Sequence, residues 1–477
     1  MKDRITYDIE RNIRFDILTQ KMKEKINEGA LTILEEIGMQ VSGARTLAKF
    51  AEQGIVPGPD GLLRIPRGLV KWALDVVPKS ITLYDISGKP RMLIDKSNRV
   101  YFGTHNDMAE IVDYKTNAAR PMLLEDIQTT CKVASNCENI DFVLSVGLIQ
   151  DVPPKIQSQM AFIESCKYME KTINFSTNDV EALQEIIDIA AELVGGHDRL
   201  AEKPFIFNYC EPIPPLTHPF ESTEKLYVSA SNGIPTVYMP YCMMGGTAPL
   251  DRPTTLAQCF AEILCGLVIT QLVREGTPYI AGSMPSIIDM KSTVASYAAP
   301  EFHLMVAASS EMADYYGLPF YGTCGCSDVK TFDQQSAAEI SYQILSTLLS
   351  KANIIHDMGL HDHCINICPA AVVWANDRIN GMKSYIRGVT GDVDLDLIRD
   401  VGPAGQHLTE DNTLERFREV WYPEIETRRR DCTPQSELYG RIVNRIDQIL
   451  ADNPGSKLSQ EQLAFLDKKA KEFLSRV

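Results

Sequence analysis

Basic residues are scarce in this 477-residue sequence. It has 47 lysines and arginines against 63 aspartates and glutamates, which gives a formal net charge of −16. Contacts with phosphate groups need basic patches, so this balance argues against a nucleic-acid partner. The remaining composition is that of a globular protein, with 44% hydrophobic and 23% charged residues, and the length suits one large domain or two.

Long apolar runs are missing as well. The longest, Phe260 to Val273, is too short and too interrupted for a bilayer, which takes about 20 residues to cross. The charged start, Met1 to Arg4, is not followed by the apolar segment of a secretion signal, so the 12 cysteines are expected to be reduced thiols. These absences predict a cytoplasmic protein with no membrane partner.

Several common motifs are also absent. No G-x-G-x-x-G turn follows a strand candidate, which counts against a dinucleotide-binding sheet, and there is no C-x-x-C and no H-E-x-x-H. The cluster His356, His361, His363, Cys364 and Cys368 offers ligands that zinc accepts, but its spacing matches no standard zinc site. We expect no bound metal, and keep a zinc-dependent barrel enzyme using residues 356–368 as an alternative.

The sequence does contain a repeated alternation of short apolar strands and longer helical patterns. Eight such units across about 290 residues predict an α/β protein of the (β/α)₈ TIM-barrel class, with residues 99–400 as the barrel. Residues 1–98 are expected to form a helical and β cap or oligomerisation segment, and residues 401–477 a C-terminal helical extension. The expected strands are Val100–Thr104, Phe142–Gly147, Ile173–Ser176, Phe205–Tyr209, Thr236–Met239, Tyr279–Gly282, Phe320–Thr323 and Ile354–Asp357, and the expected helices are 123–136, 155–169, 179–194, 221–232, 253–274, 300–316, 333–350 and 370–387.

One stretch, Pro319 to Gln335, shows the unit most clearly. A short apolar strand ends at Gly322, a loop of small residues follows, and a helix begins near Asp333. In a barrel, side chains at the carboxyl ends of the strands and on the loops after them face the active site. The residues that pass this criterion are rich in aromatic rings and poor in paired carboxylates, which indicates an apolar site with an aromatic wall.

An aromatic wall suits a quaternary ammonium group. Such a cation cannot donate hydrogen bonds, and it is held by cation–π attraction of typically ~0.5–2 kcal/mol per ring. A histidine nearby would act as a donor to a substrate carboxylate or as a proton carrier, although each ring and each histidine also has an ordinary structural explanation.

The ordered motifs resemble those of a known family. They are Tyr-Phe-Gly-Thr-His-Asn-Asp (101–107), Pro-Tyr-Cys-Met-Met-Gly-Gly-Thr-Ala-Pro-Leu (240–250), Gly-Thr-Cys-Gly-Cys-Ser-Asp-Val-Lys-Thr-Phe-Asp-Gln-Gln (322–335), Gly-Pro-Ala-Gly-Gln-His-Leu-Thr (402–409) and Trp-Tyr-Pro (421–423). Together they resemble the trimethylamine methyltransferase superfamily over nearly the whole chain. Founding members carry pyrrolysine near the segment that matches 322–335. This sequence has only standard residues there, so it resembles the nonpyrrolysine branch.

The resemblance implies a TIM-barrel enzyme that moves a methyl group from a quaternary amine to the Co(I) of a separate corrinoid protein. Glycine betaine, proline betaine, carnitine and γ-butyrobetaine are the kind of substrate it implies. A quaternary nitrogen leaves as a neutral tertiary amine, so the protein needs no nucleophile of its own and contributes mainly orientation. No tightly bound cofactor is expected in this chain, because the corrinoid belongs to the partner. A homo-oligomer is expected, and a non-catalytic betaine-binding protein is a further alternative.

Strand-end position and the resemblance together select eight candidate site residues. Asp107 and His356 are the expected catalytic residues: Asp107 places negative charge near the cation, and His356 takes a substrate carboxylate by a charge-assisted hydrogen bond. The remaining six are expected to bind substrate, as rings around the ammonium or as further carboxylate donors: Phe102, Tyr238, Tyr241, Tyr321, His361 and His363.

Overall fold

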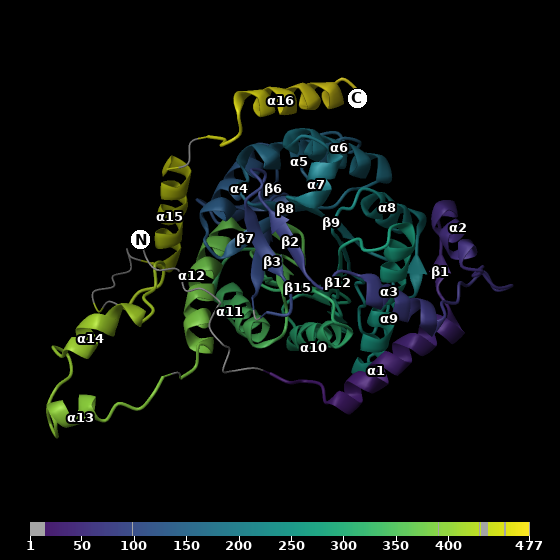
Figure 1. Ribbon diagram of the computed structural model, residues 1–477. Coiled ribbons are helices and arrows are strands. Elements are labelled where there is room, and N and C mark those ends of the chain that lie inside the picture. Colours follow the sequence, from purple (N-terminus) through teal and green to yellow (C-terminus); the bar gives the residue numbers. More distant parts are fainter. Residues whose placement is uncertain are drawn as a thin grey trace.

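A closed barrel of eight parallel strands forms the centre of the protein (Figure 1). The computed structural model describes residues 15–97, 99–389, 391–428, 430, 437–452 and 455–476. Neighbouring barrel strands pair in parallel, and the ring closes where β16 pairs with β4 and β9 with β11. The strands are β4 (Tyr101–His105), β7 (Ile140–Ser145), β8 (Thr172–Phe175), β9 (Ile206–Cys210), β11 (Thr236–Tyr238), β12 (Tyr279–Gly282), β15 (Phe320–Thr323) and β16 (Ile354–His356).

Helices surround this barrel, as the alternation predicted. Aspartates at the N-caps fix where several of them begin, because each side chain accepts a hydrogen bond from a first-turn amide: Asp179 from Ala182, Asp251 from Thr254 and Asp333 from Ser336. The helices are α4 (Asp126–Asn136), α5 (Gln157–Tyr168), α6 (Val180–Val194), α7 (His197–Glu202), α8 (Phe220–Ser231), α9 (Arg252–Val273), α10 (Pro300–Tyr316), α11 (Gln334–Leu349) and α12 (Pro369–Ile386). The (β/α)₈ prediction and its strand and helix positions are thus confirmed, with ends that differ by a few residues.

Helix α9 is long and apolar enough to cross a bilayer by length and composition, the one such helix among the described residues. It is instead largely enclosed by its own chain, because 89% of its most apolar window is buried. Part of that cover comes from α1 (Gln20–Thr32), whose Gly29 approaches so closely that a Cβ there would lie 3.0 Å from the Ala257 Cβ. The apolar face of the N-terminal helix is therefore used within the chain.

The other N-terminal elements pack against helices α8 and α9 at the side of the barrel or cover the end where its strands begin. Thr172, the first residue of β8, donates a hydrogen bond to the Tyr84 carbonyl at 2.8 Å, which holds the hairpin of β2 and β3 over this end (Figure 1). These elements are a π-helical turn (Ile33–Ile37), β1 (Gln40–Val41), α2 (Ala44–Glu52), α3 (Arg67–Val76), β2 (Ile81–Tyr84) and β3 (Pro90–Ile94). The opposite end, which we call the mouth, carries the short strands β5 (Glu110–Asp113), β6 (Ala118–Pro121), β10 (Thr217–His218), β13 (Ile287–Ile288), β14 (Ala295–Ser296), β17 (Leu360–His361) and β18 (Asn366–Ile367).

The C-terminal part divides into two regions. Residues after α12 run through α13 (Asp396–Val401), α14 (Asp411–Arg416) and a 3₁₀ turn (Phe417–Glu419), which project from the side of the barrel (Figure 1). Helix α15 (Leu438–Asp452) then packs on α12 and α4, and α16 (Gln460–Leu474) packs on α5. The helices expected near 412–420 and 436–450 correspond to α14 and α15.

Candidate active site

The alternation of side chains along each strand decides which residues enter the barrel. Gly103 of β4 faces inward, because a Cβ there would lie 2.3 Å from the ring of Phe142 of β7. That ring in turn packs against Tyr321 of β15, with centroids 6.1 Å apart. Tyr321 donates its hydroxyl hydrogen to Asn174 Oδ1 of β8 at 2.8 Å, across the barrel. These buried side chains form a floor beneath the mouth.

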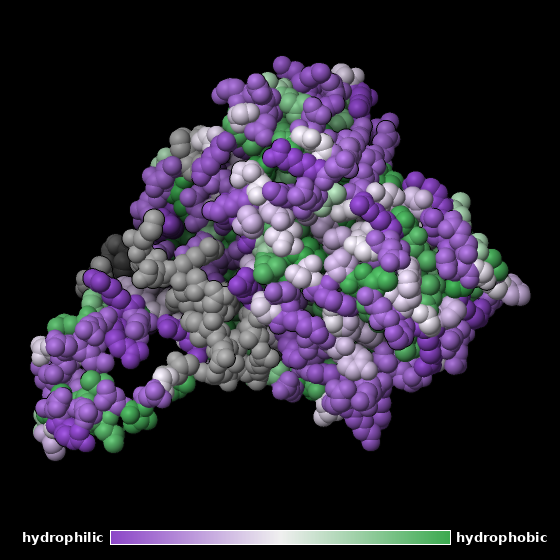
Figure 2. Space-filling model, in the orientation of Figure 1, coloured by the Kyte–Doolittle hydropathy of each residue, from purple (hydrophilic) through white to green (hydrophobic). Residues whose placement is uncertain are grey.

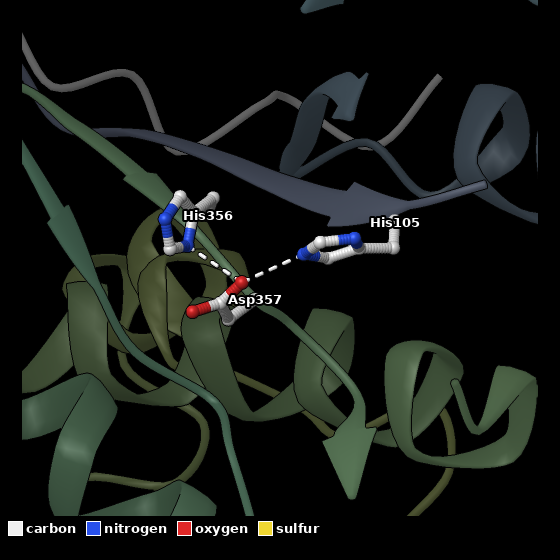
Figure 3. Close-up of side chains that lie close together, drawn as sticks. All are labelled: His105, His356 and Asp357. Atoms are coloured by element: carbon white, nitrogen blue, oxygen red, sulfur yellow. Dashed lines mark hydrogen bonds and ion pairs between the residues drawn. The ribbon is translucent and has the colours of Figure 1, made fainter. Parts of the chain in front are cut away.

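Two histidines and an aspartate lie above this floor (Figure 3). Nε2 of His105, the last residue of β4, lies 2.8 Å from Oδ1 of Asp357. Nδ1 of His356, the last residue of β16, lies 2.6 Å from the same oxygen. All three side chains are buried, and Nε2 of His356 has no hydrogen-bond partner among the described residues. This free nitrogen is available to a substrate.

The Asp357 carboxylate is held from both sides. Burial by itself would raise the pKa of Asp357, but the His356 and His105 rings outweigh burial and hold that pKa well below its usual range. Its second oxygen accepts a hydrogen bond from the Thr323 hydroxyl at the end of β15. Asp357 also has φ +77°, a conformation that side-chain-bearing residues rarely adopt and that is common at functional sites. The carboxylate is therefore a fixed negative charge at the centre of the mouth.

A second carboxyl group comes from the neighbouring side of the barrel. Tyr209 of β9 donates its hydroxyl hydrogen to Glu211, the first residue after that strand. Burial raises the pKa of Glu211, while the Tyr209 hydrogen bond acts in the opposite direction. The Tyr209 ring lies 5.7 Å from the His356 ring and 5.9 Å from the Tyr321 ring, so both carboxyl groups border one aromatic group.

Two further tyrosines complete the aromatic wall from the loops. Tyr241, which follows β11, stacks on Tyr297, which follows β14, with centroids 6.1 Å apart and planes 22° apart. Burial raises the pKa of both phenols, and the charge of Asp357 adds to the effect on Tyr297. Both rings therefore remain neutral at the edge of the same site, where they offer π faces to a cation.

Three of these groups, His105, His356 and Asp357, also match the donor types of a metal site, and their ligand atoms lie within 4.8 Å of one another. In a tetrahedral zinc site, bonds of about 2.0–2.1 Å hold ligand atoms roughly 3.3 Å apart. The two nitrogen–oxygen distances, 2.8 and 2.6 Å, are shorter than that and match charge-assisted contacts. We therefore interpret the group as a triad in which Asp357 is hydrogen-bonded to His105 and in close polar contact with His356.

The zinc alternative required a different set of residues, and the structure does not assemble it. Within the described part of the chain, the one close set of three such ligands contains His356 but none of the four other members of the 356–368 cluster. His361 is engaged by the Ser336 hydroxyl at 2.7 Å and the Gly359 carbonyl at 3.0 Å. Burial lowers the pKa of His361 to about 4, so the ring is neutral and lacks the charge that a carboxylate-binding role requires.

His363 is half-buried, and its Nδ1 lies 3.0 Å from the Ala295 carbonyl and 3.5 Å from Asp328. These contacts tie the loop after β17 to the β13–β14 hairpin at the rim. Of the three candidate histidines, the structure thus places only His356 in the central group. His361 and His363 contact other residues.

The four aromatic residues expected to surround the ammonium differ in the direction of their side chains. Tyr321 and Tyr241 belong to the site, whereas Tyr238 faces away from the barrel axis. A Cβ on Gly266 of α9 would lie 2.2 Å from the Tyr238 ring, and the hydroxyl of Tyr238 lies 2.7 Å from His218 Nδ1. Phe102 alternates with the inward-facing Gly103 and so is directed at the surrounding helices. Both residues are buried in the core instead of lining the mouth.

Asp107 has a different role from the one expected. Its Oδ1 accepts a hydrogen bond from the Val146 amide at 2.9 Å, and its Oδ2 accepts from the Gly147 and Leu148 amides at 2.5 and 2.8 Å. With both oxygens committed to backbone amides, the carboxylate fixes the loop after β7. The carboxyl groups that face the aromatic group are those of Asp357 and Glu211.

Five residues of this group were therefore missing from the expected set: His105, Tyr209, Glu211, Tyr297 and Asp357. His105, Tyr209 and Glu211 meet the strand-end criterion, so their positions in the sequence already carry a signal. Asp357 adjoins His356, but the apolar pattern assigns it to the end of the strand Ile354–Asp357. Tyr297 lies in the long insertion between β12 and α10, and no periodic pattern there connects it to Tyr241.

The fold and this site define a barrel enzyme with a buried aromatic and acidic centre at the carboxyl ends of its strands. A model of the trimethylamine methyltransferase family matches residues 2–473, so the chain belongs to that family and is a methyltransferase. It is 28% identical over 476 residues to the glycine betaine methyltransferase of Desulfitobacterium hafniense, covering 97% of each chain. It is 27% identical over 402 residues to a trimethylamine methyltransferase of the same species, covering 82% of this chain and 80% of the relative.

Among solved structures, the fold is similar to the crystal structure of the Methanosarcina barkeri monomethylamine methyltransferase. The TM-score is 0.54 at 12% identity, with 94% of this chain and 91% of the other covered. At that identity the likeness confirms the (β/α)₈ fold alone.

Proposed function

We propose that this protein transfers a methyl group from a quaternary amine to the Co(I) of a separate corrinoid protein. The observation that carries the proposal is the composition of the central site. Tyrosine rings converge there with two carboxyl groups, Asp357 and Glu211, and none of the residues that line it is an activated nucleophile. Burial raises the pKa of the nearby Cys326 and Cys364 thiols, which keeps both in the unreactive protonated form.

The charge around the site favours a cation. The loops 211–219, 239–251 and 357–368 contain no lysine or arginine, although all three follow barrel strands and border the mouth. A quaternary ammonium is attracted by the π faces of Tyr209, Tyr241 and Tyr297 and by the negative charge of Asp357 beside them. The unpaired Nε2 of His356 is the group available to a substrate carboxylate, which a betaine has and choline lacks.

The rim of the mouth has the character of a docking surface. Six large apolar side chains are exposed on loops that follow five different barrel strands, and exposed apolar groups of this kind mark interaction sites. They are Leu148, Ile213, Leu250, Met290, Val294 and Ile365. A corrinoid protein seated on this rim would bring its cobalt over the substrate.

The chain's own contribution is binding and orientation. The tyrosines and carboxylates hold the ammonium with one N–methyl group directed outward, and the closed floor of Phe142 and Tyr321 keeps the substrate at the mouth. Orientation of this kind supplies up to about 7–11 kcal/mol of a barrier reduction. The corrinoid, when its carrier is docked, supplies the cobalt nucleophile that accepts the methyl group.

A spectroscopic methyl-transfer assay tests the proposal. Reduced corrinoid, free or on a candidate carrier protein, is mixed with the enzyme and with glycine betaine, proline betaine, carnitine, γ-butyrobetaine, choline or trimethylamine in turn. Loss of the Co(I) absorption band with one quaternary amine is the expected result. Since a relative over nearly the whole chain is a glycine betaine methyltransferase, the betaines are tested first.

Two outcomes would contradict the proposal. The first is that no amine causes loss of the Co(I) band, although the corrinoid is shown to be competent, and that the purified protein contains stoichiometric zinc. This result would favour the zinc-dependent enzyme. Tight betaine binding without methyl transfer would favour a binding protein.

A further inference from the structure

The β13–β14 hairpin lies at the mouth, the end of the barrel from which a substrate approaches the site. The β2–β3 hairpin covers the opposite end, where hydrophilic residues make up most of the coloured surface in Figure 2. Tyr297, one of the rings of the aromatic wall, directly follows β14. The position of this ring therefore depends on a loop insertion and not on a barrel strand.

The hairpin has little structure of its own. Each of its strands has two residues, and a single two-stranded hairpin is marginally stable at best in water. Its first strand is held by the loop 239–251, because the Met244 amide donates to the Ser286 carbonyl at 2.8 Å and the Ile288 amide donates to the Met244 carbonyl at 3.2 Å. The strand that returns to Tyr297 needs a separate anchor.

Asp328, in the loop after β15, provides that anchor. Its Oδ1 accepts hydrogen bonds from the amides of Tyr297 and Ala298 at 2.8 and 3.3 Å, and its Oδ2 accepts one from the Ser296 hydroxyl. A carboxylate is a stronger hydrogen-bond acceptor than a neutral group. One side chain thus binds three successive residues of the hairpin's return, with Tyr297 in the middle.

The other peptide group of Tyr297 is held as well. Nε2 of His303, on α10, lies 2.8 Å from the Tyr297 carbonyl oxygen. Burial lowers the pKa of His303 to about 4, so the ring is neutral, and Nε2 carries the hydrogen because a carbonyl can only accept. Asp328 therefore binds the amide of Tyr297 while His303 binds its carbonyl.

The loop that carries Asp328 is itself fixed to α11. The Asp328 amide donates to Glu339 Oε2 at 3.2 Å, and the Ser327 hydroxyl donates to the same oxygen at 2.6 Å. On the other side, Nδ1 of His363 lies 3.5 Å from Asp328 Oδ1 and 3.0 Å from the Ala295 carbonyl. The carboxylate thus transmits the position of a barrel helix to the hairpin.

Both oxygens of Asp328 are occupied by the hairpin, so this residue acts through another group. The Tyr297 ring stacks on Tyr241 and packs edge-on to Phe302, with the centroids of the latter pair 5.8 Å apart. We propose that Asp328 is a positioning residue for methyl transfer: by holding the backbone of Tyr297, it sets that ring beside Tyr241 and so forms the π face that binds the methylated cation. The inference rests on the proposed function, because it requires that these two rings bind an ammonium group.

Calorimetric titration of the full-length protein with tetramethylammonium tests the inference without a corrinoid. Asp328→Ala should weaken binding about 10-fold, the loss expected for one desolvated cation–π contact, and should raise KM for the active amine equally with kcat nearly unchanged. Asp328→Asn removes the charge but keeps an acceptor for the Tyr297 amide, so its affinity should be within about twofold of wild type. Equal losses in the two variants would overturn the proposal, since Asp328 would then attract the cation by its charge.

A double-mutant cycle tests whether Asp328 acts through the ring. In a Tyr297→Leu background, Asp328→Ala should weaken binding by less than about twofold, because the ring that it positions is absent. Additive losses would overturn the proposal. Asp289→Ala is the matched control. Asp289 also accepts hydrogen bonds within this hairpin, from the Lys291 amide at 2.9 Å and the Ser292 hydroxyl at 2.7 Å, but it does so at the turn, and its variant should bind as the wild type does.

Failure of this inference and failure of the proposed function give different results. Wild-type protein that neither binds tetramethylammonium nor transfers a methyl group from any amine contradicts both. Wild-type protein that does both, with unchanged affinity in Asp328→Ala, overturns only the positioning role. Asp328→Glu is the second variant if circular dichroism shows that Asp328→Ala is unfolded. It keeps the charge but lengthens the side chain by one methylene, so it should also weaken binding, and wild-type affinity in it would overturn the proposal.

Discussion

Asp357 Oδ1 lies 2.6 Å from Nδ1 of His356, the residue directly before it in the chain. The strand ends at His356, and the positive φ of Asp357 turns its side chain back toward that ring. His105 approaches the same oxygen from β4, which is the neighbouring strand of the barrel. The contact engages Nδ1 of the His356 ring and leaves its Nε2 buried without a hydrogen-bond partner among the described residues.

The low pKa of Asp357 predicts a pH-dependent contribution to stability. Because the folded-state pKa lies below the unfolded value of about 3.9, ionised Asp357 stabilises the fold above that pH, and the contribution is lost as the pH falls further. We expect Asp357→Asn to cost about 3 kcal/mol at pH 7, and the gap between wild type and variant to narrow toward pH 3. Thermal unfolding at pH 7, 4 and 3 measures it. Asp362→Asn is the control, and a pH-independent gap would count against the ionised triad.

His356 and His361 give a matched test of the site. His356 has a free nitrogen at the mouth, whereas His361 is neutral and satisfied by Ser336 and Gly359. We expect His356→Ala to lower kcat/KM for a betaine about 100-fold, and His361→Ala to leave it within about twofold. Equal losses in the two variants would show that the triad is not the substrate-facing group.

The Tyr209–Glu211 hydrogen bond predicts a shift in a pH profile. Burial raises the pKa of Glu211 and the Tyr209 hydroxyl counteracts this, so Tyr209→Phe should raise the pKa further. If ionised Glu211 attracts the ammonium, KM rises as the pH falls through this pKa, and the variant shows that rise at a higher pH than the wild type. Tyr316→Phe is the control, since the Tyr316 hydroxyl has no partner among the described residues. Superimposable profiles would remove Glu211 from cation binding.

Tyr241 and Tyr238 separate substrate binding from core stability. Tyr241→Leu removes a ring at the edge of the site, and a lost cation–π contact of about 0.5–2 kcal/mol raises KM roughly 2- to 30-fold. Tyr238→Phe removes the contact with His218 behind the barrel wall and should lower the unfolding free energy by about 1 kcal/mol with no change in KM. Titration with a quaternary amine and chemical denaturation of each variant measure the two effects. An unchanged KM in Tyr241→Leu would place the ammonium elsewhere.

The barrel was predictable from the sequence because each strand is a short apolar run bounded by turn residues, and parallel strands buried on both faces have this pattern. The direction of individual side chains was less accessible. Tyr238 and Tyr321 both lie in barrel strands and have the same chemistry, yet one faces α9 and the other the barrel axis. A three-residue strand such as β11 is too short to show which of its alternating positions faces inward.

Asp107 illustrates a second limit. A carboxylate after a strand end is equally suited to hold a ligand or to bind loop amides, and only the path of the 146–148 backbone distinguishes these roles. The pairing of His105 with Asp357 depends on closure of the barrel, which makes β4 and β16 neighbours although they are the first and last barrel strands. Local sequence patterns therefore do not predict the contact between His105 and Asp357.

The floor of the site depends on one glycine, and this gives the sharpest stability test. Gly103 faces the barrel interior, where the ring of Phe142 occupies the space that a side chain would take. Because the ring packs against Phe207 and Tyr321, it has no room to withdraw, and Gly103→Ala should cost about 3 kcal/mol or more. The control is Gly68→Ala in α3, where a Cβ meets no atom within 4 Å and alanine should stabilise the helix by up to about 1 kcal/mol. Denaturant titration of both variants measures the contrast, and an equally stable Gly103→Ala protein would mean that Phe142 does not cover the barrel axis as described.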